Sequence, residues 1–351
     1  MTDAVAVILM FGITAYALFA GADFGAGFWD LTAGSAAHGA RPRAVIQHSI
    51  GPVWEANHVW LIFVLVVLWT AFSSTFASIT LTLFVPLSLA AFGIVLRGSS
   101  FAFRKEVTIA SSQRNFGAAF AISSVVVPFC MGAVAGAIAS GQVPAGGKAG
   151  DPWSSWINPT SILGGVLAVA VCAFLAAVYL VWDARRLEDA EMVEYFRNRA
   201  VASAVVTGAV AFIGIFILHD YAHYVFDGLT SRALPLVILS ALCGLGALVL
   251  LVRNATGGAR VLAMGAVATV VVGWGVAQWP YILPTSLKVS QAAAPSGTLT
   301  AVIVVFVIAA VVLLPSLGLL YTLDQKSLID ADESAPGPAP GSTPESAPAG
   351  P

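Results

Sequence analysis

Charged residues are scarce in this chain. Of its 351 residues, 58% are hydrophobic and only 10% are charged, whereas about 25% are charged in an ordinary soluble domain. The mean hydropathy is +0.89. So few charges cannot cover a surface that faces water on all sides, and the chain has no basic patch of the kind that binds nucleic acid. The composition predicts a polytopic membrane protein.

Cysteine pairs and the basic start of a cleavable leader are also lacking. Cys130, Cys172 and Cys243 each lie alone inside an apolar run, with no C-x-x-C pair, so they are interpreted as packing residues. The first apolar run has no Lys or Arg before it, unlike the basic start of a signal peptide. We therefore expect it to be retained as the first membrane helix, although Ala20-Gly21-Ala22 loosely resembles a cleavage site.

Motifs of soluble enzymes are missing as well. The chain has no glycine-rich phosphate loop, no H-E-x-x-H and no serine-elbow motif. Nothing in the sequence therefore indicates hydrolysis or nucleotide binding of the soluble type.

Long apolar runs dominate what is present. A membrane-spanning helix needs about 20 mostly apolar residues, and nine segments qualify. The second and third are separated only by Ser73-Ser74-Thr75, which predicts a tight helical hairpin. Glycine pairs inside the spans, such as Gly132 and Gly136, favour close helix packing. The nine segments are 4–22, 53–72, 76–96, 116–139, 161–182, 201–219, 233–252, 261–280 and 299–321.

The distribution of Lys and Arg between the loops predicts the orientation in the membrane. Loops rich in these residues stay in the cytoplasm. All but three of the sixteen fall on one side: Arg41, Arg43, Arg97, Arg104, Lys105, Arg114, Arg185, Arg186, Arg197, Arg199, Arg253, Arg260 and Lys326. The other side receives Lys148, Arg232 and Lys288. The N-terminus is therefore expected outside and the C-terminus in the cytoplasm, which requires an odd number of spans.

The C-terminal end has a different composition. From Ala331 onward it consists mainly of Ala, Pro, Gly and Ser with a few acids, too few apolar residues to form a core. We predict a transmembrane domain over 1–325 and a disordered cytoplasmic tail over 326–351.

The most unusual stretch for a membrane segment is 51–60, where Glu55, Asn57 and His58 stand at the mouth of the second span. An ionisable residue inside the membrane is costly unless paired, so it indicates a functional site. Trp54, Glu55 and His58 are spaced to share one helix surface. The predicted topology brings Asp23 and Arg97 to the same inner side, where Arg97 is expected to pair with Asp23 or Glu55. Such a cluster is suited to proton relay.

Each of these residues also has a simpler interpretation. Glu55 fits a hydrated carboxylate at a helix start, and Arg97 fits a cytoplasmic anchor that reaches the interface. His58 fits a hydrogen-bonded group, with heme or metal ligation as the alternative. His219 and His223 have the i, i+4 spacing of a metal site, but neighbouring aromatic residues favour a wet interfacial cluster.

Five stretches resemble the second subunit of cytochrome bd-type quinol oxidases; the match at residues 51–60 is specific, the proline-rich one at 280–284 is moderately so, and the others support them. Residues 21–27, Gly-Ala-Asp-Phe-Gly-Ala-Gly, are similar to the G-x-D-x-G-x-G end of that family's first helix. Residues 51–60 are similar to its P-x-W-[DE]-x-N-x-V-W-L signature. Arg97, Asn158-Pro159 and the stretch Pro280-Tyr281-Ile282-Leu283-Pro284 match in the expected order, so the resemblance covers nearly the whole chain.

The resemblance implies an all-helical subunit built from two four-helix bundles plus a peripheral helix, in the bacterial plasma membrane. It implies a heterodimer with a first subunit that carries heme b, heme d and the quinol site, while this chain binds no heme. The complex would oxidise quinol and reduce dioxygen to water. By position, Glu55, Asp23 and Arg97 would belong to a proton-uptake path from the cytoplasm, with Trp54, Asn57 and His58 beside them.

Two positions depart from the family's pattern, and rival functions follow from the same residues. Ala20 stands where some members carry a second acid, and His58 stands where others carry glutamine or another polar residue. A proton-coupled secondary transporter would use the same cluster, and a membrane cytochrome would use His58 and His219 as ligands. The type of quinol, a structural quinone or lipid, and small single-span subunits are left open by the sequence.

Overall fold

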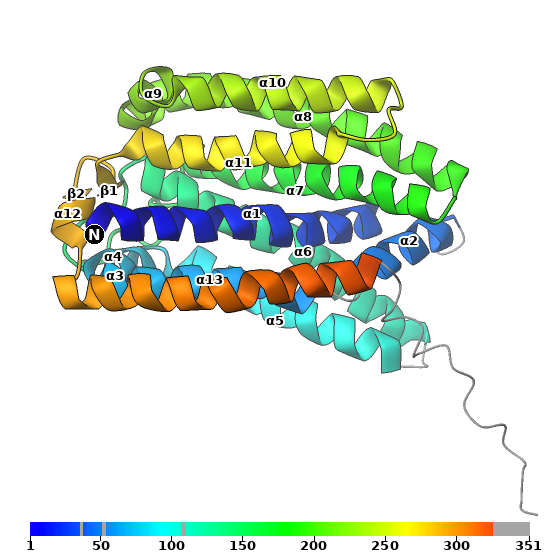
Figure 1. Cartoon of the computed structure of the whole chain (residues 1–351), viewed down its shortest axis with the longest axis horizontal. Coiled ribbons are helices and arrows are strands. Elements are labelled where there is room, and N and C mark those ends of the chain that lie inside the picture. Colours follow the sequence, from blue (N-terminus) through cyan, green and yellow to red (C-terminus); the bar gives the residue numbers. More distant parts are fainter. Residues whose placement is uncertain (36–37, 51–53, 107–109, 326–351) are drawn as a thin grey trace, which may run out of the picture. The chain divides into compact units, whose positions relative to one another are not determined.

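The structure, a computed structural model, describes residues 1–35, 38–50, 54–106 and 110–325 (Figure 1). The side chains of residues 50, 54–56, 101–106 and 110–116, and of several residues after 313, are outside this description. The chain divides into two units, Met1–Val304 and Val305–Pro351, and the packing below concerns the first. The predicted tail over 326–351 falls outside the described residues, so its boundary stays a prediction.

Seven helices of the described residues are long and apolar enough to cross a membrane. They are α1 (Thr2–Thr32), α6 (Ala110–Ala139), α7 (Pro159–Arg186), α8 (Ala190–Tyr221), α10 (Leu234–Val252), α11 (Ala259–Gln278) and α13 (Ser296–Gln325). Each coincides with a predicted span. The all-helical, polytopic membrane fold expected from the composition is confirmed.

The predicted hairpin between the second and third spans is wrong in its details. α3 (Trp54–Ala71) is followed by a short helix, α4 (Ser73–Thr82), which bends away by 119° and precedes α5 (Phe84–Glu106). Ser73-Ser74-Thr75 is therefore helical, and the predicted span 76–96 is divided. Pro86 has no N–H to donate to the Thr82 carbonyl, which favours the interruption between α4 and α5.

Polar contacts hold α4 in place. The Ser78 hydroxyl accepts a hydrogen bond from the Gly147 N–H at 3.0 Å, and the Thr82 hydroxyl accepts one from the Gly150 N–H at 2.9 Å. Both side chains are fully buried. Hydropathy alone could not anticipate this arrangement, because the partners lie in a loop far along the chain.

Short elements close the two ends of the first unit. α4, α9 (His223–Thr230), α12 (Val289–Ala292) and the strands β1 (Tyr281–Leu283) and β2 (Leu287–Lys288) lie at the end where the chain begins, while α2 (Ala40–Ile50) lies at the opposite end (Figure 1). The strands pair antiparallel. They follow α11, with β1 inside the Pro-Tyr-Ile-Leu-Pro stretch and β2 just after it, and the sequence analysis predicted no strand there.

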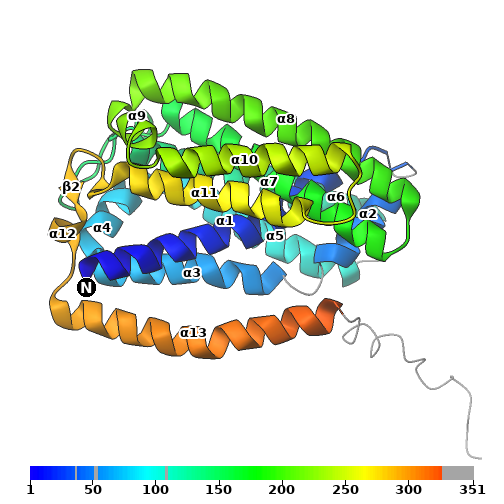
Figure 2. The same ribbon diagram turned by 45° about the horizontal axis from the view of Figure 1, so that its top comes forward.

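α1 is the central helix of the first unit. It contacts α3, α6, α7 and α11, while α5 packs on α6 and α8 packs on α7. α10 lies along α11 and also contacts α8 (Figure 2). The residues of α1 therefore face both the helices that precede α7 and those that follow it.

Glycine allows α6 and α7 to approach closely. A Cβ atom at Gly132 would overlap the carbonyl oxygen of Gly164, and one at Gly164 would overlap the carbonyl oxygen of Gly132. Helices in lipid gain stability from such close van der Waals packing. The small-residue packing predicted for these glycines is confirmed.

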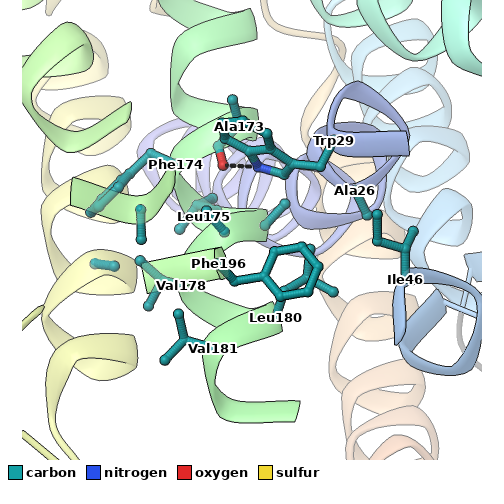
Figure 3. Packing of buried hydrophobic residues seen from close by; sticks show 14 of the residues in the cluster. Ala26, Trp29, Ile46, Ala173, Phe174, Leu175, Val178, Leu180, Val181 and Phe196 are labelled. Carbon is teal, nitrogen blue, oxygen red and sulfur yellow. Dashed lines mark hydrogen bonds between the residues drawn. The ribbon is translucent and has the colours of Figure 1, made fainter. Parts of the chain in front are cut away.

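The largest apolar core cluster joins α1 and α2 to α7, α8, α10 and α11. Leu175, Leu180 and Phe196 are buried in it, and the indole N–H of Trp29 donates to the Ala173 carbonyl at 2.8 Å (Figure 3). This bond satisfies the polar atom of a buried tryptophan. It fixes the last turns of α1 against the middle of α7.

Arginines tie together the connections at the α2 end. Arg41 of α2 pairs with Asp189 at 2.9 Å and with Glu191, both at the start of α8. Arg185 near the end of α7 donates to the Ala255 carbonyl at 2.6 Å and to the Asn254 side chain at 2.8 Å. These cations belong to the set that the sequence places in the cytoplasm.

Candidate functional site

Asp23 is the acid at the centre of the candidate site. α1 continues for two more turns beyond it, so Asp23 lies within the helix and does not end the span as the sequence suggested. Its side chain is 8% exposed. The Asn57 amide of α3 donates to the Asp23 carboxylate at 2.6 Å. Asp23 and Asn57, 34 residues apart, are thus brought together as predicted.

Arg97 is the largest fully buried side chain of the described residues, with 1% of its surface exposed. It therefore does not reach the interface as a cytoplasmic anchor would. One guanidinium nitrogen donates to the main-chain carbonyl of Asp23 at 2.7 Å, and another donates to the Ser124 hydroxyl. The guanidinium also lies over the rings of Phe24 and Phe120, at 5.1 and 4.2 Å from their centres. This arrangement is suited to holding a cation away from water.

The pairing expected between Arg97 and Asp23 takes a different form. Among the ion pairs between described residues, none joins Arg97 to the Asp23 carboxylate. The guanidinium binds the main-chain oxygen, while Asn57 takes one of the carboxylate oxygens. The Asp23 carboxyl is thus near a buried cation but not locked to it.

Ser124 of α6 completes the cluster, and the sequence analysis missed it. Its hydroxyl donates to the Phe120 carbonyl at 2.6 Å and accepts from Arg97. The signal was a polar pair, Ser123-Ser124, inside an otherwise apolar span. A serine that bonds back to its own helix is common, so the sequence alone did not distinguish it.

Glycine lets α1 approach these side chains. A Cβ atom at Gly27 would overlap the Ser124 hydroxyl and come within 2.8 Å of an Arg97 nitrogen. A Cβ atom at Gly25 would overlap the carbonyl oxygen of Cys172 in α7. The two glycines of the Gly-x-Gly pair after Asp23 therefore face different neighbours, and each is required by a close contact.

His58 lies one residue beyond Asn57 and faces α1. Its ring is half-buried and meets the rings of Phe24 and Tyr16 edge-on, at 5.8 and 6.5 Å between centres. His58 therefore packs on α1 against Phe24, the residue that follows Asp23 in the chain. Its side chain belongs to the cluster predicted from the sequence.

Two of the predicted site residues cannot be placed in this cluster. Trp54 and Glu55 stand in the first turn of α3, but their side chains lie outside the described residues. Their participation stays a prediction.

His219 and His223 do not share one continuous helix. α8 ends at Tyr221 and α9 begins at His223, so the helix is interrupted at Ala222. His219 pairs with Asp220 at 2.8 Å, and both imidazoles are exposed. The part of the chain that the structure describes holds no group of three or more His, Cys, Asp or Glu side chains able to bind a metal ion.

Comparison with known proteins decides the family. The model of cytochrome bd terminal oxidase subunit II matches residues 1–324. The chain belongs to this family.

Two relatives agree with that assignment. The chain is 26% identical to cytochrome bd ubiquinol oxidase subunit 2 of Bacillus subtilis over 227 residues, which cover 64% of each protein. A chain of the bd oxidase of Geobacillus thermodenitrificans has the same fold, with a TM-score of 0.76, 26% identity and coverage of 92% of this chain and 98% of that one. Membership of this family does not favour the transporter alternative.

Proposed function

We propose that this chain is the second subunit of a bd-type quinol oxidase, which oxidises a membrane quinol and reduces dioxygen to water. The match of the subunit II family over residues 1–324 carries this proposal. The buried group formed by Asp23, Asn57, Arg97 and Ser124 supports it, because such costly residues are retained inside a membrane protein chiefly for function.

The partner in this proposal is a first subunit that holds heme b, heme d and the quinol site. This chain would form a heterodimer with it in the bacterial plasma membrane. The residues of this chain fit that division of labour: the half-buried His58 is packed edge-on by two rings of α1, and the histidines at 219 and 223 are exposed. The hemes supply electron transfer and oxygen chemistry, and this chain supports the subunit that carries them.

The proposed orientation places the α2 end in the cytoplasm and the end with α9 and α12 outside. Arg41 and Arg185 bind loop residues at the α2 end. Arg232 and Lys288 lie at the end with α9 and α12. This arrangement follows the rule that cationic loops remain inside. The proposed architecture has nine spans, eight of them in two groups of four, α1–α3–α5–α6 and α7–α8–α10–α11, with α13 as the peripheral helix.

The proposed role of the polar cluster is to conduct protons from the cytoplasm. Reduction of dioxygen to water consumes protons, and a carboxyl group inside the membrane can take one up and release it. Asn57 orients the Asp23 carboxyl, and Arg97 offers a positive field without occupying that carboxyl. Glu55 would receive protons at the start of α3, with Trp54 and His58 beside it.

Purification through a tag on this chain tests the proposal. We expect a heme-rich partner to co-purify, visible by its absorption, and the complex to consume oxygen when supplied with a quinol. A colourless, stable protein that transports a solute would contradict it. A heme spectrum from this chain expressed alone would instead revive the cytochrome alternative.

The proton role is tested separately. In the purified complex, Glu55→Gln should slow oxygen consumption per heme and leave the heme spectrum intact, because only the ionisable group is removed. Glu55→Asp should have a milder effect. Turnover of Glu55→Gln at the wild-type rate would refute the role of Glu55.

A further inference from the structure

A second buried acid lies on α1 beyond Asp23. Asp30 is seven residues further along the helix, which returns it to nearly the same face, about 10 Å along the axis. Its side chain is 6% exposed. The sequence analysis did not single it out, because it sits past the expected end of the first span.

Polar residues of the candidate site lie next to the face of α1 that joins the two acids. Gly27 stands four residues after Asp23 and three before Asp30, and a Cβ atom at this position would meet the Ser124 hydroxyl and a guanidinium nitrogen of Arg97. The same guanidinium binds the Asp23 carbonyl. Polar groups therefore lie along this face of α1 from Asp23 towards Asp30. The other faces of α1 are packed with apolar side chains.

Beyond Asp30 the polar groups reach the surface. Arg43 of α2 pairs with the Asp30 carboxylate at 3.2 Å, and its side chain is 23% exposed compared with 6% for that of Asp30. Arg43 also donates to the carbonyls of Gly34 and Ser35, at 2.7 and 3.2 Å, in the turn that follows α1. The turn is thus held by two main-chain contacts that do not involve Asp30.

Stabilising the turn after α1 does not by itself account for a buried carboxylate at Asp30. Taking a carboxylate out of water costs several kcal/mol, and an ion pair often does no more than offset that cost. Since Arg43 already closes the turn through main-chain oxygens, an apolar or amide side chain at position 30 would be the less costly choice.

We propose that Asp30 is a further carboxyl of the proton route, placed between the α1–α2 turn and the Asp23 cluster. The inference rests on the proposed function. Asp30 takes a proton from water near Arg43, becoming a neutral carboxyl, and returns it to a water molecule on the Asp23 side, becoming a carboxylate again. Water must bridge the interval, because about 10 Å is too long for direct transfer between the carboxyls.

The test compares Asp30→Asn with Asp30→Glu in the assembled complex. Oxygen consumption is measured per heme, in H₂O and in D₂O. We expect Asp30→Asn to lose about tenfold in rate and to show a larger solvent isotope effect, since a missing relay makes proton transfer more limiting. Asp30→Glu should recover most of the rate. Asp3→Asn is the matched control: it makes the same change at an exposed position in the first turn of α1 and should leave both readings unchanged.

Arg43→Gln separates a relay from a structural contact. It removes the same ion pair but keeps the Asp30 carboxyl, so its isotope effect should stay below that of Asp30→Asn. Equal rates and equal isotope effects for the two variants would overturn the proposal. Should Asp30→Asn fail to assemble, an Asp30→Glu complex whose rate falls well below that of the wild type with an unchanged solvent isotope effect would overturn it equally.

Failure of this inference can be told apart from failure of the proposed function. If Asp23→Asn slows oxygen consumption while Asp30→Asn matches the wild type, Asp30 is not on the route but the function stands. If neither Asp23→Asn nor Glu55→Gln changes the rate, the proton route itself is refuted. A complex without heme or oxidase activity refutes the function as a whole.

Discussion

The helices before α7 and those from α7 to α11 have interiors of different chemistry. Among the described residues, the charged side chains that are buried are Asp23, Asp30 and Arg97, and all three belong to α1 and α5. The interior shared by α7, α8, α10 and α11 is formed by residues such as Leu180, Phe196 and Val267. One set of helices carries costly polar groups, and the other packs apolar surfaces.

In the proposed function, this difference separates a part that conducts protons from a part that supports the fold. Buried charges add little net stability to a protein, so their concentration in α1 and α5 points to chemistry. Apolar packing around α7 stabilises the fold, and among the described residues no buried side chain of α7, α8, α10 or α11 is a carboxylate or a basic group. Substitutions in each part test whether turnover depends on the buried charges and stability on the apolar packing.

Replacing Arg97 by methionine should have the largest effect. The change removes the guanidinium that donates to the Asp23 carbonyl and to the Ser124 hydroxyl, so both acceptors lose the bond from Arg97. Breaking such a buried network costs about 3–5 kcal/mol. We expect little assembled complex, measured as heme-bearing protein recovered and as its unfolding temperature. The control is Arg253→Gln, which replaces an exposed arginine after α10. Equal losses of heme-bearing protein in both variants would show that the buried arginine matters no more than an exposed one.

Leu180→Ala should lower stability but not activity. Leu180 is 2% exposed in the apolar core, and truncation of a buried leucine costs about 2–5 kcal/mol. The unfolding temperature of the complex should fall, while oxygen consumption per heme stays at the wild-type value. A reduced rate per heme would show that the apolar part contributes to turnover. Leu239→Ala, on an exposed position of α10, should change neither quantity.

Hydropathy predicted most of the fold and failed at the bend. Seven apolar segments correspond to single helices, because about 20 apolar residues leave no alternative to a spanning helix. The α3–α4–α5 region differs because its geometry depends on Ser78 and Thr82, which bind the backbone of a loop near residue 150. The strand pair after α11 was missed because its strands, Tyr281–Leu283 and Leu287–Lys288, are too short to give a pattern in the sequence.

The candidate site was predicted in part. The spacing of Asn57 and His58 and the resemblance of the first-helix motif placed them with Asp23 and Arg97, and the structure brings these four together. Sequence reasoning could not show that Arg97 is buried, because an arginine near a helix end usually reaches water. It missed Ser124 and Asp30 because their importance follows from the neighbours of Gly27 and Arg43, which only the folded chain reveals.

Gly25→Ala should have an intermediate effect, because Gly25 lies at the boundary between the two parts. The added methyl group would overlap the Cys172 carbonyl and force α1 away from α7. Overpacking of this kind costs about 1–3 kcal/mol. We expect a lower unfolding temperature, together with a slower rate per heme, since Asp23 moves with α1.

Gly208→Ala is the matched control for this prediction. Nothing lies within 4 Å of the added methyl group, so no packing is disturbed, and alanine favours a helix more than glycine does. If Gly25→Ala behaves like Gly208→Ala, the contact between α1 and α7 has no influence on the candidate site.

His219→Asn should have the smallest effect, and it tests whether the supporting part holds a site of its own. The side chain of His219 is 59% exposed, and it contacts Asp220, His223 and Phe226, which are close to it along the chain. Exposed substitutions of this kind change stability by about 0.5 kcal/mol or less. The heme spectrum, the rate per heme and the unfolding temperature should therefore match the wild type. A lost heme band would place a ligand on α8, and the chemical contrast between the two sets of helices would no longer separate function from support.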